Sequence, residues 1–459
     1  MSLQDSIYLN SPVFIQNFGA SYYGFKLFIK KYLLGYNDYL NYLNKSQWMS
    51  KFKFNNLQLK LLKNCVREAY YNVPFYNKTF KEANVKPDDI KKLSDLSKLP
   101  ILTKEEVRYN SHKLCSKKYK NSQVEIHHTS GTTGKALELI WGNDALMREY
   151  SFVSRHRNSV NVYNRDVHAT FNGRLIKKYS DVKPPFWRHN FFENQYLFSM
   201  HHLSEINMNL YIKQLKKIKP IYIEGYPSLI YSISEFINNN NFKPINVKAI
   251  FTSSETLLDY QRKSIEKAFN TKVLNWYGNT ELAGSASECE FGSMHINGEY
   301  GIFEVLKDGD SVINEKGELI LTNFINPAMP FIRYNIGDIA SVSNEYCKCG
   351  RVLPILNEVE GRMDDIIITP EGVFLGRLDH IFKSLENIKE SQIIQEKLDK
   401  IIVKIVPRKN YSKKDEISLM YELQTRMGPS FYFEIKCVEK IEKDKSGKFR
   451  SVISKINKQ

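Results

Sequence analysis

A stretch of seven residues, Thr129–Lys135, concentrates residue types that bind phosphate. It reads Thr-Ser-Gly-Thr-Thr-Gly-Lys. Glycine lets a backbone approach a ligand closely. Consecutive backbone N–H groups can then turn toward one anion, while hydroxyls and a lysine add donors and charge. The spacing of a Walker A loop is absent, and the stretch taken alone is more often an ordinary polar turn. With suitable partners elsewhere in the chain, it would suit a triphosphate.

A second group of chemically active residues combines three cysteines with a histidine. Cys289 and His295 lie close together in the sequence, and Cys347 and Cys349 flank a single lysine. If an antiparallel region brings the two pairs together, the four side chains would suit a structural zinc site. The spacing is not the standard pair of CxxC motifs, and the alternative is two buried thiols beside a satisfied histidine. We favour the zinc site.

The elements that must position these residues include short apolar strands, each followed by a polar turn. The predicted strands are Tyr222–Gly225, Ala249–Thr252 and Val273–Tyr277. Helical patterns separate them, and strands that alternate with helices favour a parallel α/β sheet. Because ligands of such sheets gather at the carboxyl ends of the strands, we expect the turns after these strands to share one pocket.

Other strands are predicted around the Gly-rich stretch and farther along the chain. Val124–Thr129 and Ala136–Trp141 would enter and leave the stretch. Between residues 300 and 345 the pattern predicts antiparallel strands at Gly301–Val305, Glu318–Thr322 and Ile339–Val342.

Helix signals are clearest in the first quarter of the chain. Leu57–Tyr71 predicts a helix that ends before Pro74. Thr103 is the expected N-cap of a helix over Lys104–Tyr109, with Glu106 completing a capping box.

The N-terminal segment, residues 1–56, is rich in aromatic and basic residues. Aromatic and aliphatic side chains recur at helical spacing between residues 25 and 36, with lysines interleaved: Phe25, Phe28, Ile29, Tyr32 and Tyr36. Such a helix can lie on a membrane surface, form an oligomer contact or cover the core. Core packing is the commonest of these, and we favour it.

Composition limits the class of protein. The 459 residues, 42% of them hydrophobic, are enough for a substantial core and for two or three domains. The net charge of +16 is typical of proteins that meet anions, but an Asn/Lys/Ile-rich genome explains it equally well. No Lys/Arg cluster is large enough to favour nucleic acid. The scattered cysteines and the lack of a membrane-length or signal-like apolar run favour a cytoplasmic protein, with peripheral membrane contact left open.

Six ordered motifs together resemble a known family. They are Thr129–Lys135, Gly225–Ser228, Tyr277–Glu281, Arg333–Asp338, Gly361–Asp365 and Ser446–Arg450. In this order they resemble the adenylate-forming ligases, in particular the branch of phenylacetate–CoA ligases and CapK-type capsule-biosynthesis proteins. The resemblance begins near residue 57, and the region Gly376–Asn387 with Gln392–Gln395 looks CapK-like in particular.

The resemblance implies an α/β fold with two domains after the N-terminal segment. Residues 57–361 would form a large domain that binds ATP and substrate, with parallel α/β sheets and an antiparallel β subdomain. Residues 362–459 would form a small, mobile α+β domain, with Asp364 at the hinge.

The resemblance also implies which residues hold ATP. They are Thr129, Ser130, Gly131, Thr132, Thr133, Gly134, Lys135, Ser254, Glu255, Tyr277, Gly278, Asp338 and Arg362. The Gly-rich stretch would bind the β- and γ-phosphates. Tyr277 would stack on adenine, Ser254 and Glu255 would line the base pocket, and Asp338 would bind the ribose hydroxyls beside Arg362.

Three further residues are implied in the chemistry itself. Thr280 would contact the α-phosphate, Glu281 would hold Mg²⁺, and Lys448 would stabilise the negative charge that develops at phosphorus. Outside these motifs, Glu281 would be read as a surface carboxylate and Lys448 as a solvated lysine. The residues expected near the acyl group are His201, His202, Tyr226 and Pro227.

The function implied is ATP-dependent adenylation of a small carboxylic acid, with release of pyrophosphate. The acyl group would then pass to the thiol of coenzyme A or to an amine, for example a sugar-linked one, in polysaccharide biosynthesis. The alternative is a non-catalytic, nucleotide-binding subunit of a membrane-associated glycan assembly complex. The sequence does not choose the acid, the acceptor or the oligomeric state.

Overall fold

The computed structural model describes most of the chain. The described residues are 3–33, 35–129, 137–360, 367–372, 374–375, 378–382, 385, 387–442 and 451–456. Several residues singled out in the sequence lie outside this part of the chain: Ser130, Gly131, Thr132, Thr133, Gly134, Lys135, Arg362, Asp364 and Lys448.

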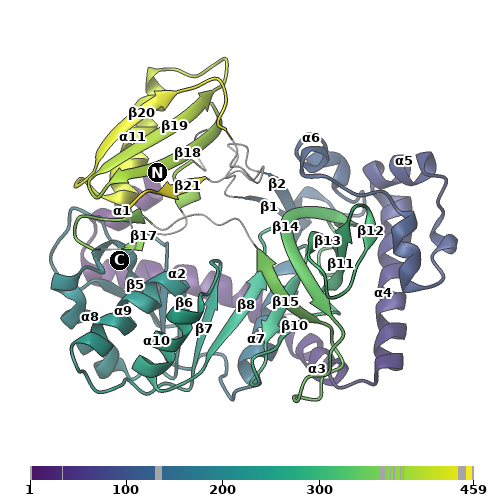
Figure 1. Cartoon of the computed structure of the whole chain (residues 1–459), viewed down its shortest axis with the longest axis horizontal. Coiled ribbons are helices and arrows are strands. Elements are labelled where there is room, and N and C mark those ends of the chain that lie inside the picture. Colours follow the sequence, from purple (N-terminus) through teal and green to yellow (C-terminus); the bar gives the residue numbers. More distant parts are fainter. Residues whose placement is uncertain are drawn as a thin grey trace.

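One mixed sheet forms the centre of the large domain (Figure 1). Its parallel strands lie in the order β5-β3-β6-β7-β8. They are β3 (His168–Asn172), β5 (Gln195–Ser199), β6 (Tyr222–Gly225), β7 (Ala249–Ser253) and β8 (Val273–Gly278). Successive side chains alternate between the faces of a sheet. Ile223 and Ile250 therefore enter one core, while Tyr222 and Phe251 enter another on the opposite face.

The antiparallel strands continue the same sheet. Beyond β8 the order is β9-β10-β15-β14-β13-β11-β12, and β4 lies at the other edge beside β5. They are β4 (Trp187–Asn190), β9 (Ser285–Glu288), β10 (Met294–Ile296), β11 (Gly301–Lys307), β12 (Asp310–Ser311), β13 (Gly317–Asn323), β14 (Tyr334–Ser343) and β15 (Ile355–Glu360). The expected combination of parallel and antiparallel parts is confirmed, with both in one continuous sheet.

A separate two-stranded ribbon flanks the Gly-rich stretch. β1 (Val124–His128) pairs antiparallel with β2 (Glu138–Gly142). The Thr129 N–H donates to the Leu137 carbonyl at 3.0 Å, and the Leu137 N–H donates to Thr129 Oγ1 at 2.9 Å. Strands enter and leave the stretch as the sequence predicts, and their pairing holds its two ends together.

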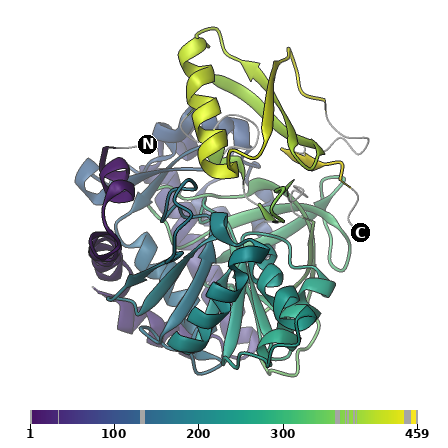
Figure 2. The ribbon, with the colours of Figure 1, turned by 90° about the vertical axis from the view of Figure 1, so that its left-hand side faces the viewer.

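Helices cover both faces of the sheet (Figures 1 and 2). The first group packs on the core that contains Ile223: α8 (Glu205–Ile218), α9 (Pro227–Asn239) and α10 (Asp259–Phe269). The second group packs together around β4 and the start of the chain: α1 (Leu3–Asn10), α2 (Val13–Tyr32), α3 (Tyr36–Ser46) and α7 (Ala145–Asn158). A third surrounds the core of the antiparallel half: α4 (Lys51–Asn72), α5 (Pro74–Glu82) and α6 (Lys104–Leu114).

Local signals explain where two of these helices begin and end. α4 starts after Ser50, whose hydroxyl accepts the Lys53 N–H, and stops before Pro74, as predicted. α6 has the predicted capping box, in which Thr103 and Glu106 each accept the other's backbone N–H. α4 begins six residues earlier than the predicted helix, so the proposed boundary after residue 56 falls inside it.

α2 covers the core as expected, but its buried face coincides only in part with the expected one. Its buried residues are small or polar, namely Gln16, Ala20, Ser21, Gly24 and Lys31. Of the expected core positions, Phe25 and Ile29 are more than a third exposed, Phe28 and Tyr32 are half-buried, and Tyr36, at the start of α3, is buried. The helix therefore packs through a close, polar contact with β4 and α7. No helix within the described residues combines the length and apolar character needed to cross a bilayer.

The C-terminal domain, residues 367–456, stands over the parallel half of the sheet (Figure 2). Its sheet has the order β20-β19-β18-β21 and carries α11 (Lys413–Met427), while β16 and β17 form a small hairpin. The strands are β16 (Ile367–Ile368), β17 (Phe374–Leu375), β18 (Ile388–Lys397), β19 (Lys400–Pro407), β20 (Tyr432–Cys437) and β21 (Val452–Ser454). Hydrophobic side chains of both domains form one contiguous core. Gly428, which follows α11, lies so close to Tyr179 that a Cβ would come within 2.5 Å of the ring.

Candidate functional site

A cavity of about 460 Å³ lies where the parallel strands end. Gly173 follows β3, Gly225 ends β6 and Tyr226 follows it, and Ser254 follows β7, so turns far apart in the sequence meet at one edge of the sheet. β8 contributes Trp276. The turns after β6 and β7 thus share a pocket at the carboxyl ends of parallel strands, as expected, whereas the turn after β8, which begins at Asn279, is not among the lining residues. We call this pocket the acyl cavity, after the role that we propose for it.

Tyr277 and Asp338, both implied to bind the nucleoside, are brought together although they are 61 positions apart. The Tyr277 hydroxyl donates to Asp338 Oδ2 at 2.8 Å. Burial raises the pKa of Tyr277 well above its ordinary value, and the carboxylate of Asp338 raises it further. The phenol therefore stays protonated and fixes the orientation of the carboxylate that the ribose would meet.

Glu281 lies at the start of the polypeptide between β8 and β9, beside the exposed Thr280 and Gly278. Its side chain is buried, and Oε1 accepts the Tyr334 hydroxyl at 3.3 Å. Asn279 shapes the turn by accepting the Ala283 N–H at 2.8 Å. Among the described residues, the Tyr334 hydroxyl is the one hydrogen-bond donor to this carboxylate, which leaves oxygen lone pairs that suit a hard cation such as Mg²⁺.

Glu255 has a contact that sequence reasoning did not foresee. Its Oε2 accepts the backbone N–H of Ser228, in the first turn of α9, at 3.1 Å. Pro227 is the first residue of that helix. A carboxylate at a helix N-terminus satisfies an otherwise unpaired donor and meets the positive end of the dipole. Glu255 thus ties the turn after β7 to the turn after β6, while Ser254 adopts a left-handed conformation at a φ of 72°.

The four predicted zinc ligands meet in one cluster. Their potential ligand atoms all lie within 4.8 Å of one another. Cys289 Sγ is 3.7 Å from Cys347 Sγ, and Cys349 Sγ is 3.2 Å from His295 Nε2. Two thiolates on one tetrahedral zinc lie about 3.8 Å apart, given a Zn–S bond of about 2.3 Å, so the spacing of the sulfur atoms fits the ion.

The surroundings of this cluster also suit a metal. His295 Nδ1 donates to the Leu353 carbonyl at 3.2 Å, because a carbonyl can only accept. That contact fixes the tautomer and leaves the lone pair of Nε2 directed at the cysteines, as in metal-bound histidines. The backbone N–H of Cys349 donates to Cys347 Sγ, and that of Arg351 donates to Cys349 Sγ, each at 3.5 Å. Such donors stabilise thiolate charge.

The chain is similar over nearly its whole length to Protein CapK of Staphylococcus aureus. The two are 31% identical over 467 residues, which cover 98% of this chain and 99% of the relative. This chain belongs to the CapK family. Residues 367–455 also match the family model described as the CapK C-terminal domain.

Other relatives place this CapK-family chain in the adenylate-forming superfamily. Phenylacetate-coenzyme A ligase of Escherichia coli is 24% identical over 84% of this chain and 89% of the relative. The enzyme of the same name from Thermus thermophilus is 25% identical over 71% and 74%. Among solved structures, 2-hydroxyisobutyryl-CoA ligase with 2-HIB-AMP and CoA has a TM-score of 0.60 at 19% identity, over 89% of this chain and 91% of that one. The fold is that of the CoA ligases.

The two histidines expected near the acyl group lie beneath the C-terminal domain in this CapK-family structure. His201 is beside Arg426 of α11, and burial lowers its pKa to about 3. His202 stacks on Phe186, and its Nδ1 is 2.8 Å from Ser199 Oγ. Neither lines the acyl cavity, whereas Tyr226 does. The contact of His201 and His202 with substrate stays a prediction.

Sequence reasoning missed several polar residues that line the acyl cavity. Arg157 on α7, Thr170 on β3 and Glu224 on β6 all face it. Glu224 did carry a signal, because a carboxylate inside a short, otherwise apolar strand needs a buried partner. That partner, Arg157, is 67 positions away and could not be named from the sequence.

Proposed function

We propose that this chain uses ATP to adenylate a carboxylic acid and then transfers the acyl group to the thiol of coenzyme A. One observation carries the proposal: the acyl cavity, the Tyr277–Asp338 pair and the buried Glu281 all depend on β8 and the turns beside it. A nucleoside bound at Asp338 and an acid bound in the acyl cavity would thus lie at the same edge of the sheet, where they could react with each other.

The residues present fit the cofactors that this reaction uses. ATP would be held by Asp338 and Tyr277 at the nucleoside and by Thr129 and its following residues at the phosphates. Glu281 would hold Mg²⁺, which neutralises phosphate charge when bound. Lys448 would come from the C-terminal domain, with Asp364 as the hinge that lets this domain move.

The same proposal includes a structural zinc ion held by Cys289, His295, Cys347 and Cys349. This site would join the β9–β10 region to the segment between β14 and β15. Its role would be to fix these two segments, since a site with four protein ligands leaves no open position for chemistry.

The test is ATP–pyrophosphate exchange across a panel of carboxylic acids, followed by AMP release with and without CoA. We expect exchange that depends on the acid and AMP release that depends on CoA. AMP release with an amine and no CoA would instead identify an amide-forming ligase. ATP binding without exchange for any acid would contradict the proposal and favour a non-catalytic nucleotide-binding subunit.

A further inference from the structure

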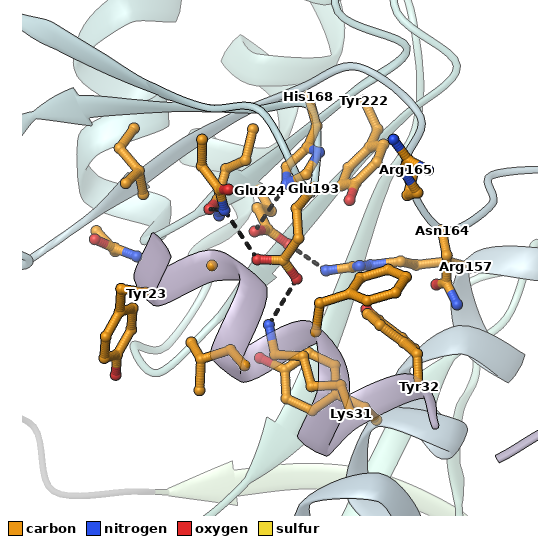
Figure 3. Close-up of a pocket in the computed structure, with 18 of the residues that line it drawn as sticks. Tyr23, Lys31, Tyr32, Arg157, Asn164, Arg165, His168, Glu193, Tyr222 and Glu224 are labelled. Atoms are coloured by element: carbon orange, nitrogen blue, oxygen red, sulfur yellow. Dashed lines mark hydrogen bonds and ion pairs between the residues drawn. The ribbon is translucent and has the colours of Figure 1, made fainter. Parts of the chain in front are cut away.

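A second cavity, of about 190 Å³, lies next to the acyl cavity and beneath α2 (Figure 3). The two share lining residues that include Tyr150, Arg157 and Glu224, so they form adjoining parts of one space. We call the second part the polar chamber and define it by Lys31, Arg157, Asn190, Glu193, Gln195 and Glu224. It extends the acyl cavity away from β7 and β8, where the nucleotide would lie.

A continuous chain of polar contacts lines the chamber. Lys31 donates to Glu193 Oε1 at 2.9 Å, and Asn190 donates to Glu193 Oε2 at 3.1 Å and to Gln195 Oε1 at 3.2 Å. Gln195 donates to Thr170 Oγ1 at 2.9 Å. This series of hydrogen bonds continues into the acyl cavity. There Thr170 donates to Glu224 Oε1 at 3.0 Å, and Arg157 donates to Glu224 Oε2.

The buried charges of the chamber are balanced. Lys31 pairs with Glu193 and Arg157 pairs with Glu224, and all four are buried or nearly so (Figure 3). Burial alone would lower the pKa of Arg157, but Tyr222 and Glu224 outweigh it and raise this pKa. Burial would likewise raise the pKa of Glu224, and the charge of Arg157 lowers it instead. Both groups are therefore ionised, and a further charge on a ligand would have no buried partner. The other two arginines that line the chamber, Arg165 and Arg174, are exposed to solvent.

The residues that line the chamber keep hydrogen-bonding capacity that the network does not use. It uses one of the five N–H donors of Arg157. The carboxylates of Glu193 and Glu224 each accept two of these hydrogen bonds, about half of what a carboxylate can accept. Donors and acceptors are thus interspersed, which suits a hydroxyl because it can both donate and accept.

We propose that the acid activated by this chain carries neutral hydroxyl groups at the end remote from its carboxylate, and that these groups occupy the polar chamber. This inference rests on the proposed adenylation and names the class of its substrate. An acid with an apolar tail, such as phenylacetate or hexanoate, would displace water from buried donors and acceptors without replacing its hydrogen bonds.

The discriminating experiment compares acids of equal carboxylate chemistry in ATP–pyrophosphate exchange. D-gluconate and D-glucuronate supply hydroxylated tails, and hexanoate and phenylacetate supply apolar ones. We expect kcat/KM for at least one hydroxylated acid to exceed that for both apolar acids by roughly 100-fold, because a site built around hydroxyls rejects acids that lack them. Equal or better exchange with the apolar acids would overturn the inference and leave the adenylation proposal intact. No exchange with any acid would overturn both.

A variant links the preference to the chamber. Gln195→Leu keeps the size of the side chain but removes a donor and an acceptor from the network. We expect it to lower the ratio of kcat/KM for the hydroxylated acid over hexanoate by about tenfold, mainly through KM. The matched control is Gln214→Leu, a buried glutamine of α8 that lines a separate cavity and should leave the ratio unchanged. Thermal unfolding checks that both variants fold. If Gln195→Leu does not fold, the isosteric Thr170→Val takes its place, and an unchanged ratio in the folded variant refutes the chamber's role.

Discussion

At the scale of single residues, the charge of Glu281 can be separated from its contact with Tyr334. Glu281→Gln keeps the size of the side chain and an oxygen that accepts the Tyr334 hydroxyl. We expect ATP–pyrophosphate exchange to fall by roughly 100-fold or more, because a preorganised charge at the phosphates is lost, while the unfolding temperature stays nearly the same. Glu315→Gln, which removes an exposed carboxylate paired with Lys307, is the control. If Glu281→Gln exchanges pyrophosphate as fast as the unchanged chain, Glu281 is not the Mg²⁺ ligand.

Glu149 on α7 makes stability depend on pH. Burial raises its pKa to about 7, although the neighbouring Tyr300 opposes the shift. The folded state therefore holds a proton that the unfolded state loses near pH 4.5, and stability falls as the pH rises from there through 7. At about 1.4 kcal/mol per pKa unit, the loss is roughly 3 kcal/mol.

The variant Glu149→Gln imitates the protonated carboxyl. We expect its free energy of unfolding to match that of the unchanged chain near pH 5 and to exceed it by roughly 2–3 kcal/mol at pH 8. Denaturant unfolding at both pH values measures the difference. If the free energies of unfolding of the variant and the unchanged chain differ by the same amount at pH 5 and at pH 8, the Glu149 carboxyl does not titrate as described.

At the scale of elements, the turn after β6 depends on Gly225. Its φ is +155°, and a Cβ there would lie 2.0 Å from the carbonyl oxygen of Phe171 on the adjacent β3. Backbone atoms of a central strand cannot move away, so we expect Gly225→Ala to destabilise the fold by about 3 kcal/mol or more. Gly173 lines the same cavity, and the Cβ added by Gly173→Ala would make only ordinary van der Waals contacts with Tyr226 and Met200. It should retain near-normal stability, and similar thermal unfolding of the two variants would contradict this account.

The zinc proposal also concerns how elements are joined. We expect protein purified without added zinc to contain close to one zinc per chain, measured by elemental analysis. Cys347→Ser should lower both the zinc content and the stability, the latter by about 3 kcal/mol or more. Cys437→Ser, which changes an exposed cysteine of β20, should alter neither. A folded, fully stable protein without zinc would refute the site.

How far the sequence predicts these elements depends on where their partners lie. Tyr222–Gly225 was predicted with correct bounds because a short apolar run ends in a turn motif. The start of α6 was predicted because its capping box is local, whereas the helix runs on to Leu114, beyond the predicted end at Tyr109. β3 and β5 were not delimited, since their polar residues pair with distant ones: Thr170 with Glu224, 54 positions away, and Gln195 with Thr170. The cysteine cluster was predictable as chemistry, while its convergence required the register of β10 against β15.

At the scale of the whole molecule, adenylation would require the C-terminal domain to bring Lys448 to the nucleotide. Lys448→Ala should abolish exchange and leave ATP affinity nearly unchanged, because the charge acts on the developing transition state. Isothermal calorimetry with ATP and the exchange assay measure the two effects. Lys440→Ala, an exposed lysine of the same domain, is the control. Normal exchange by Lys448→Ala would exclude this lysine from the chemistry.

The close packing of α2 on β4 indicates which part of the chain the site needs. Gly24 faces Asn190 so closely that a Cβ would lie 2.2 Å from its side-chain oxygen, and Lys31 of the same helix completes the wall around Glu193. In a chain shortened to begin at α4, the polar chamber would be open to bulk water on the side that α2 covers. If the chain has the proposed activity, we expect removal of these helices to reduce discrimination among acids, which would make the first helices part of the selective site.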